Sequence, residues 1–440
     1  MPSGHKQRSN QRFPPGRGGC HIGREPTDES MTELLIARDD ELRLGSAAHH
    51  TDRSFVDVEL TRLRAALQAT AVQRDQQGGH AAAERELIRA SGLLGLSIAR
   101  DLGGIGGSVS DVLRVTRELA QVDSALAHVL AFHHLQLYGL ALYTGPAAAL
   151  HASRHWRETA EQGLFWGNAL NPADPRLRAR RTVQGWRIDG LKGFCSGALG
   201  SDRLTVSATT EQGEVLIGIL PTRRAGVRVA ADWNAFGQRQ TDSGSVSFDD
   251  VELADEELLQ RPGETASPRT TLRAQLAQLI MTQLYLGLAE GAFEEARRFT
   301  REQSRPWAAS GQSRVVDDPL IQHRYGDLWL QVRAAQAVSA SAIDRLEGAL
   351  ARGSALTAAE RGEVAIASAE AKVLAHRAAL QVGSQMFELT GARSTDRALG
   401  LDRFWRNARV HTLHDPVDYK LRDLGRFHLD DQWPEPSAYS

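Results

Sequence analysis

Two groups of histidines in this chain have a spacing that could bring imidazole rings into one site. His128 and Phe132 lie four residues apart in a stretch that predicts a helix, so they share one face of it. Near the other end of the chain, His411-x-x-His414-Asp415 places two imidazoles beside a carboxylate. Such groups can bind a metal ion, or they can exchange protons near neutral pH. A proline follows the carboxylate and breaks a continuous helix there, so a metal site is the weaker interpretation and we predict none.

A second stretch with possible chemistry covers residues 186–202 and reads WRIDGLKGFCSGALGSD. Its alternation predicts a strand, a tight turn at Asp189-Gly190, and a second strand that carries Phe194 and Ser196. An aromatic ring and small polar groups between glycines would suit a flat heterocycle at a sheet edge, because backbone amides there can hydrogen-bond ring atoms. An ordinary hairpin with a buried Phe194 has the same pattern. Taken alone, the stretch favours the ordinary hairpin.

The composition excludes several classes of function. The chain has 440 residues, of which 41% are hydrophobic and 24% charged, and this is ample for two or three domains. A net charge of -2 gives no bulk attraction to nucleic acid or to a membrane surface. No uninterrupted apolar run is long enough to span a bilayer. With only Cys20 and Cys195, a disulfide framework is ruled out, and we expect a cytoplasmic protein that acts on small molecules.

The candidate residues are distributed over three predicted domains. Residues 1–50 predict a disordered extension, because the first 30 contain prolines, glycines and arginines with hardly any apolar residue. Residues 51–162 show helical periodicity and predict an N-terminal helical domain that carries His128. Residues 163–262 contain short segments rich in Val, Ile and Thr between turn residues, which predict a middle antiparallel β domain.

Residues 263–440 predict a C-terminal four-helix bundle. No proline occurs from Arg269 to Arg305, and leucines and isoleucines recur every four residues at its start. A capping box at Thr357 to Glu360 begins a helix that ends near residue 389, and residues 321–351 supply a helix between these two. The fold class is therefore α+β, with strands between two helical domains.

Across roughly residues 55–440, the chain resembles the acyl-CoA dehydrogenase superfamily, whose members bind a flavin where a helical, a β and a bundle domain meet. Within that superfamily it is similar to the flavin-dependent monooxygenases of the dibenzothiophene monooxygenase type. The resembling stretches are AERELIRASGLLGL at 83–96, WGNA at 166–169, GLKGFCSGALGSD at 190–202, RQTDSGS at 239–245, QLYLGLAEGA at 283–292, SRPW at 304–307 and DRFWRNARVHTLHDPVDYK at 402–420.

The resemblance implies where the flavin and the substrate bind. The catalytic groups that it implies are His128, Ser196 and His414. The implied flavin contacts are Asn168, Phe194, Ser196 and Trp233, with Arg305 reaching the flavin phosphate of a neighbouring subunit, and the implied substrate contacts are His128 and Phe132. A homotetramer with flavin at the subunit borders also follows from the resemblance. Two positions depart from the expected pattern, since Phe132 replaces a tyrosine and Gly193 replaces a histidine.

Reduced FMN and O2 are the cofactor and co-substrate that the resemblance implies. FAD-binding members have a Gln-x-x-Gly-Gly-x-Gly turn, whereas residues 385–392 read QMFELTGA and lack the paired glycines. No nicotinamide site is visible, so we expect a separate flavin reductase to supply the electrons. A C4a-hydroperoxyflavin would then oxygenate a small apolar heteroaromatic or organosulfur substrate, such as a dibenzothiophene-like sulfide going to sulfoxide and sulfone. His128, Ser196 and His414 would donate hydrogen bonds to the reacting oxygens.

Two other functions fit the same predicted fold. An FAD-dependent acyl-CoA dehydrogenase needs a carboxylate base, which could only be Asp415, one methylene shorter than the usual glutamate. A flavoprotein without catalytic activity would need the histidines only for packing. This chain has His414-Asp415-Pro416 where a dehydrogenase would have its glutamate, and this difference favours the monooxygenase.

Overall fold

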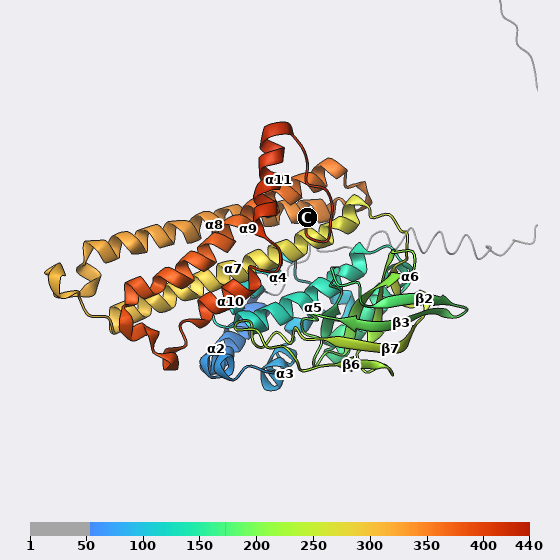
Figure 1. Ribbon diagram of the computed structural model, residues 1–440, viewed down its shortest axis with the longest axis horizontal. Helices are drawn as coiled ribbons and strands as arrows, with labels where there is room; N and C mark the ends of the chain where they lie inside the picture. The colour runs from blue at the N-terminus through green and yellow to red at the C-terminus, as the bar shows by residue number, and fades with distance from the viewer. Residues whose placement is uncertain (1–52, 172) are drawn as a thin grey trace, which may run out of the picture. The chain divides into compact units, whose positions relative to one another are not determined.

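The computed structural model describes residues 53–171 and 173–440, and the predicted extension of residues 1–50 lies outside these ranges. The described part begins with the α-helices α2 to α6, which form the predicted N-terminal helical domain (Figure 1). Their bounds are α2 Arg53–Gln77, α3 Ala82–Ala90, α4 Val109–Ala120, α5 Ser124–Leu142 and α6 Pro146–Gln162. The predicted cap at Asp123 is confirmed, because its side chain accepts hydrogen bonds from the N–H groups of Ala125 and Leu126.

Helix α5 is the central element of this domain and carries His128 and Phe132. All 19 of its residues are buried. By length and composition, α5 is also long and apolar enough to cross a membrane. The sequence shows no uninterrupted apolar run of this length, because polar residues interrupt the helix. Its complete burial by neighbouring elements is what the core helix of a folded domain shows.

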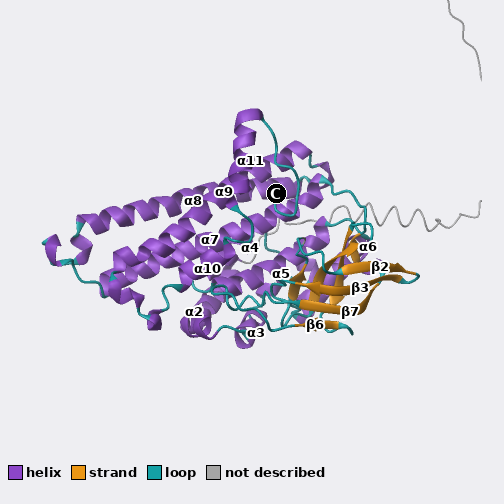
Figure 2. Ribbon diagram, in the orientation of Figure 1, coloured by secondary structure: helices purple, strands orange, loops and turns teal. Residues whose placement is uncertain are grey.

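The middle domain is one curled sheet of eight strands among the described residues (Figure 2). The strands are β1 Trp166–Ala169, β2 Arg178–Thr182, β3 Gly185–Lys192, β4 Arg203–Thr210, β5 Val215–Pro221, β6 Val227–Val229, β7 Val246–Leu253 and β8 Leu258–Gln260. Their order is β6-β7-β3-β2-β4-β5-β8, and β1 pairs with β4. Most pairs are antiparallel as predicted, but β1 and β2 both run parallel to β4. Long connections to β4 allow these parallel pairs.

The predicted turn at Asp189-Gly190 is wrong. Strand β3 continues through these residues, and its register against β7 shifts between Ile188 and Gly190, which marks a β-bulge. A side chain at Gly190 would lie 2.2 Å from the carbonyl oxygen of Arg176, and its φ is 127°. The glycine is therefore required by a close backbone approach rather than by a hairpin. The predicted second strand is also wrong, because the chain leaves the sheet after Lys192 and forms a loop.

The C-terminal domain contains the three long helices that the sequence predicts. Helices α7 Pro268–Glu302, α8 Pro319–Ala351 and α9 Ala358–Thr390 have 35, 33 and 33 residues. The capping box of Thr357 and Glu360 begins α9 as predicted. The shorter helices α10 Arg403–His411 and α11 Val417–Asp430 pack on α9. Helix α7 packs on α4 and α5, so the two helical domains share one continuous hydrophobic core.

Candidate active site

One large cavity lies where α5, α7, the region after α10 and the loops of the sheet meet. Its volume is about 1280 Å³. Seven of the eight predicted site residues line it, and these are His128, Phe132, Asn168, Phe194, Ser196, Trp233 and His414. The early helix, the sheet and the region near the C-terminus therefore contribute side chains to one wall, as the sequence predicts.

His128 is the most constrained of these residues. Its ring stacks on Phe132 with centroids 4.1 Å apart, which is the contact expected between residues four apart on a helix. Its Nδ1 lies 2.8 Å from Nε2 of His411, and its buried Nε2 has no hydrogen-bond partner among the described residues. Burial, with a contribution from the charge of His414, lowers the pKa of His128 to about 3, so the ring is neutral at pH 7.

The hydrogen bond between His128 and His411 determines which ring nitrogen carries a proton. Burial first, and then His128 and other nearby charges, lower the pKa of His411 well below its usual value. Two neutral rings share one proton in their hydrogen bond. If His128 donated it, an N–H would remain unpaired at the buried Nδ1 of His411. If His411 donates it, the unpaired N–H is instead at Nε2 of His128. We adopt this arrangement because His128 lines the cavity, where a bound ligand can accept that hydrogen bond.

His414 is oriented by a buried ion pair. Its Nδ1 lies 3.1 Å from Oδ1 of Asp415, and the same oxygen accepts a short hydrogen bond from Nζ of Lys372. Burial by itself would raise the pKa of Asp415, but His414 and Lys372 outweigh it and hold the pKa well below the usual value. The carboxylate accepts the Nδ1–H of His414, which leaves Nε2 of this ring available to exchange a proton.

Asp415 is a poor candidate for a catalytic base. It does not line the cavity, its pKa is lowered, and it is paired with a lysine whose side chain is 1% exposed. A dehydrogenase base must reach the substrate and be able to take up a proton. The geometry therefore contradicts the acyl-CoA dehydrogenase hypothesis for this residue.

Ser196 lies at the end of a chain of hydroxyl groups. Its Oγ is 2.8 Å from Oγ of Ser243, which is 2.8 Å from Oγ1 of Thr241, and Thr241 donates to the carbonyl oxygen of Gln238 at 3.0 Å. Each hydroxyl has one proton, and Thr241 uses its own for Gln238. Thr241 must therefore accept from Ser243, and Ser243 must accept from Ser196. Ser196 then presents lone pairs to the cavity. This differs from the donor role expected from the sequence, and suits an acceptor for a flavin ring N–H.

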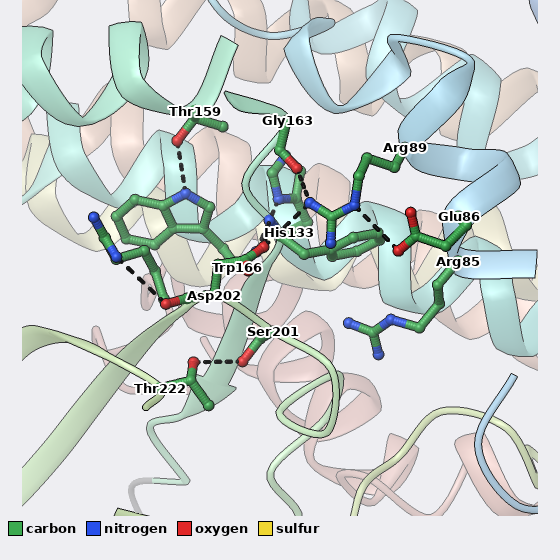
Figure 3. Close-up of polar contacts among 12 residues, drawn as sticks. Arg85, Glu86, Arg89, His133, Thr159, Gly163, Trp166, Ser201, Asp202 and Thr222 are labelled. Atoms are coloured by element: carbon green, nitrogen blue, oxygen red, sulfur yellow. Dashed lines mark hydrogen bonds and ion pairs between the residues drawn. The ribbon is translucent and has the colours of Figure 1, made fainter. Parts of the chain in front are cut away.

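Asn168 lies on β1, which is fixed to the helical domain by buried polar contacts. The carboxamide oxygen of Asn168 accepts a hydrogen bond from Leu170 N–H at 3.1 Å, so its NH2 group remains as a donor. The preceding Trp166 donates its backbone N–H to Nδ1 of His133 at 3.2 Å, and its indole N–H to Thr159 at 2.9 Å (Figure 3). Arg89 reaches from α3 to the carbonyl oxygen of Gly163, just before β1.

Phe194 and Trp233 form the aromatic part of the cavity wall. Phe194 has φ of 58°, an uncommon conformation for a non-glycine residue, and its side chain is 68% exposed rather than buried as in an ordinary hairpin. Its ring meets Trp233 edge to face, with centroids 6.1 Å apart. Such a strained, exposed aromatic residue is typical of a binding site.

Arg305 is the predicted site residue that does not line the cavity. It follows the end of α7, whereas the cavity is lined by residues 270–281 near the beginning of this helix. At about 1.5 Å per residue, the more than 20 residues between them span roughly 30 Å. Arg305 is exposed and cannot reach the cavity of its own chain. Its role toward a neighbouring subunit stays a prediction.

The sequence did not indicate two parts of the wall. The sequence suggests His411 only as a weak metal ligand or as an ordinary buried histidine, whereas its Nε2 lies 2.8 Å from Nδ1 of His128, which is 283 residues away in the sequence. The C-terminal segment also lines the cavity, where the Tyr439 ring lies 5.6 Å from that of His414. Lys420 and Arg361 hold this segment by bonding the carbonyl oxygens of Tyr439 and Pro434. No local pattern could reveal these contacts.

The described residues contain no group of three or more histidine, cysteine or acidic side chains that could hold a metal ion. His411 contacts His128, while His414 contacts Asp415. The two histidines of the His-x-x-His sequence are therefore engaged in separate contacts.

The buried histidines predict an acid-sensitive fold. Burial lowers the pKa of His128 to about 3 and that of His133 to about 4, against about 6.5 in an unfolded chain. The unfolded state therefore binds more protons below pH 6.5, and stability is lost as the pH falls from there. We expect each ring to reduce the free energy of unfolding by about 2 kcal/mol between about pH 7.5 and pH 5.

Urea denaturation at these two pH values measures this loss. His133→Gln should flatten the dependence on pH, whatever it does to stability at pH 7.5. Equal unfolding free energies at both values for the unsubstituted protein would contradict a neutral, buried state of the rings. Carboxylates with lowered pKa values, such as Asp174, titrate below this window and do not interfere.

The cavity wall fits a flavin and a small substrate. Buried Nε2 of His128 and Oε1 of Gln238 have no partner among the described residues, so a ligand can satisfy both. Asn168 adds a donor, Ser196 an acceptor, and Phe194 with Trp233 an aromatic surface for a flat ring. This set of groups matches the mixed donors and acceptors at the edge of an isoalloxazine ring.

Comparison with known proteins agrees with this fit. The acyl-CoA dehydrogenase N-terminal domain family matches residues 50–149, and the acyl-CoA dehydrogenase C-terminal domain family matches residues 279–419. The probable FMNH2-dependent monooxygenase SfnC of Pseudomonas putida is 46% identical over 375 residues, which cover 84% of this chain and 94% of the relative. A relative that matches along nearly its whole length is thus named as a probable FMNH2-dependent enzyme.

Solved structures agree with the same assignment. The methanesulfinate monooxygenase MsuC of Pseudomonas fluorescens has a TM-score of 0.84 and 45% identity, and the match covers 87% of this chain and 98% of the other. The complex of TdsC from Paenibacillus sp. A11-2 with FMN and indole has a TM-score of 0.83 and 36% identity, and covers 88% and 100%. This chain belongs to the acyl-CoA dehydrogenase superfamily, in its branch of monooxygenases that use reduced FMN and O2.

Proposed function

We propose that this protein is the oxygenase of a two-component system that transfers one oxygen atom from O2 to a small organosulfur or heteroaromatic compound. The observation that carries the proposal is the meeting of His128, Ser196 and His414 at one cavity, beside an aromatic surface. A separate flavin reductase would supply the reduced FMN. The related enzymes that act on dibenzothiophene and methanesulfinate support an organosulfur substrate.

The side chains of the cavity have distinct tasks in such a reaction. Reduced FMN, when bound, supplies the electrons that activate O2 for transfer of one oxygen atom. His128 donates a hydrogen bond from Nε2, where negative charge develops on oxygen, and Ser196 accepts one from the flavin ring. His414, held by Asp415, can hold or release a proton at Nε2. Phe132 and neighbouring apolar groups exclude water, which slows wasteful release of peroxide.

Phe132 affects which substrates bind. It provides no hydroxyl where the resemblance leads one to expect tyrosine, and its ring stacks on His128 instead of hydrogen-bonding a ligand. The substrate therefore meets an apolar surface on this side, and a polar group of the substrate must be recognised elsewhere in the cavity.

A turnover assay with a chemical source of reduced FMN tests the proposal. The enzyme, reduced FMN and O2 are mixed with dibenzothiophene, indole and methanesulfinate, and products are identified by mass spectrometry with 18O2. We expect one 18O atom per turnover in at least one product. If a wider panel of sulfides and sulfinates also gives no labelled product, while the flavin only forms hydrogen peroxide, the proposal is wrong.

We also propose that the protein is a homotetramer. Helix α8 exposes large apolar side chains, including Trp329 at 46% and Leu330 at 68% exposure, which a neighbouring subunit could cover. Arg305 is exposed and would be available to the flavin phosphate of that subunit. A monomeric mass by light scattering at micromolar concentration would contradict this proposal.

A further inference from the structure

The phenol ring of Tyr439 lies in the cavity wall next to the ring of His414. Tyr439 is half-buried, and the two rings meet edge to face with centroids 5.6 Å apart. The hydrogen bonds of Tyr439 within residues 53–171 and 173–440 use its backbone N–H and carbonyl oxygen, and none uses its hydroxyl. Burial and the charge of Asp415 raise the pKa of Tyr439, so the hydroxyl keeps its proton at neutral pH. A ligand in the cavity can therefore use this hydroxyl as a donor.

The segment that carries this ring is held by α9 and α11. After α11 the chain turns back toward α9 (Figure 1). The Trp433 ring lies against Gly362 of α9, where any side chain would begin 2.6 Å from that ring. At the other end of the segment, Nζ of the buried Lys420 donates to the carbonyl oxygen of Tyr439, whose N–H bonds Oγ of Ser437 at 3.1 Å. The position of the phenol is thus largely set before a ligand binds, which lowers the entropy cost of a hydrogen bond from it.

Location separates Tyr439 from Tyr143, the other tyrosine that lines the cavity among the described residues. Tyr143 follows the end of α5, 15 residues after His128 and about 22 Å along the helix, and its ring lies 5.6 Å from the guanidinium carbon of Arg273. Tyr439 instead contacts His414, and the charge of His414 contributes to the lowered pKa of His128. Tyr439 therefore lies at the end of the cavity where the two histidines meet the reacting atoms.

A neutral donor at this place complements the apolar surface of Phe132. Phe132 stacks on His128 and provides no hydroxyl, so a polar group of the substrate must be recognised by another part of the wall. A phenol can donate one hydrogen bond without requiring a charge on its partner. The wall near His414 therefore suits a largely apolar molecule that carries an acceptor oxygen.

We propose that Tyr439 is a specificity-determining residue, whose hydroxyl donates a hydrogen bond to an acceptor oxygen of the substrate. It raises the affinity for apolar molecules that carry such an oxygen, relative to the same molecules without it. This rests on the proposed function. Because Tyr439 contacts His414, the acceptor oxygen would be attached to the atom that is oxidised or to one of its neighbours.

Equilibrium binding to the protein loaded with oxidised FMN tests this assignment, because no turnover occurs without a reductant. The probes are two pairs that differ by one oxygen atom, namely dibenzothiophene with its sulfoxide and thioanisole with methyl phenyl sulfoxide. We expect Tyr439→Phe to weaken binding of both sulfoxides roughly tenfold, because one hydrogen bond is lost, and to leave the Kd values of the sulfides unchanged. Tyr419→Phe is the matched control, since Tyr419 is 57% exposed and does not line the cavity, and all four Kd values should stay the same.

Binding of FMN, measured by fluorescence without substrate, is the second readout. An unchanged Kd for FMN in Tyr439→Phe supports a substrate contact, whereas a Kd weaker by about tenfold would assign the hydroxyl to the flavin and overturn the inference. Equal losses for sulfides and sulfoxides, no loss for either, or binding of no probe by the unsubstituted protein would also overturn it. The assay with 18O2 does not depend on these binding measurements, so labelled product would leave the proposed function standing in each of these cases. If the wider panel gives no labelled product, the proposed function and this inference both fail.

Discussion

Replacing His128 by alanine lowers the rate of oxygenated product by about 10² to 10⁴-fold, and the reduced flavin forms hydrogen peroxide instead. The reason is the position of Nε2, a buried donor without a partner that the hydrogen bond from His411 orients. Ser196 cannot replace this donor, because its own proton is directed to Ser243. The measurement is the amount of 18O-labelled product and the amount of hydrogen peroxide formed per reduced FMN consumed, in the variant and in the unsubstituted protein.

Substitutions of His411 separate orientation from chemistry. His411 contacts His128 through Nε2, so His411→Gln can still present a donor near that atom, whereas His411→Leu cannot. We expect His411→Gln to keep more coupling between flavin oxidation and product than His411→Leu. Both variants should bind FMN, because His411 acts through His128 and not on the flavin.

His134→Gln is the matched control for a buried histidine of the same helix. His134 is 1% exposed, and its ring nitrogens contact Ser97 and the carbonyl oxygen of Leu93, away from the cavity. This variant should lose stability but keep its coupling per folded molecule. Equal uncoupling in His134→Gln and His128→Ala, or full coupling in His128→Ala, would contradict the role of His128.

The features that sequence predicted well are set by neighbours along the chain. The capping box at Thr357 and the cap at Asp123 involve residues within four positions, so their patterns determine where helices begin. The shared face of His128 and Phe132 likewise follows from helical geometry alone. Such local rules place the elements but not the contacts between them.

The features that the sequence missed depend on distant residues. The glycine at 190 looked like a turn residue, yet it allows β3 to pass the carbonyl oxygen of Arg176. The parallel pairing of β1 with β4 joins residues 37 apart, such as Asn168 and Thr205. His411 and Lys372 acquire their partners only when α9 and α10 pack in the bundle. Seven of the eight predicted site residues line one cavity, because the family resemblance that named them carries this long-range information, and their individual roles stay predictions.

Lys372→Met is expected to destabilise the fold by about 3–5 kcal/mol, because it leaves the buried charge of Asp415 without its lysine partner. Lys372 is 1% exposed and donates to Asp415 and to Gln278 Oε1. Without the lysine, the pKa of Asp415 should rise above that of an unfolded aspartate, since burial is then opposed only by His414. The destabilisation caused by Lys372→Met should therefore shrink as the pH falls toward that pKa, so the difference in unfolding free energy between the variant and the natural protein is smaller at pH 5 than at pH 7.5.

The double variant Lys372→Met with Asp415→Asn distinguishes a lost ion pair from a damaged core. Removing both charges should cost less than Lys372→Met alone, because no unpaired charge remains in the core. Arg345→Met is the control for an exposed pair, since Arg345 and Glu363 are 51% and 54% exposed, and should cost less than about 1 kcal/mol. Urea denaturation at pH 7.5 measures all three. If the double variant were as unstable as Lys372→Met, the loss would come from packing of the lysine stem, and His414 would owe its orientation to something other than this ion pair.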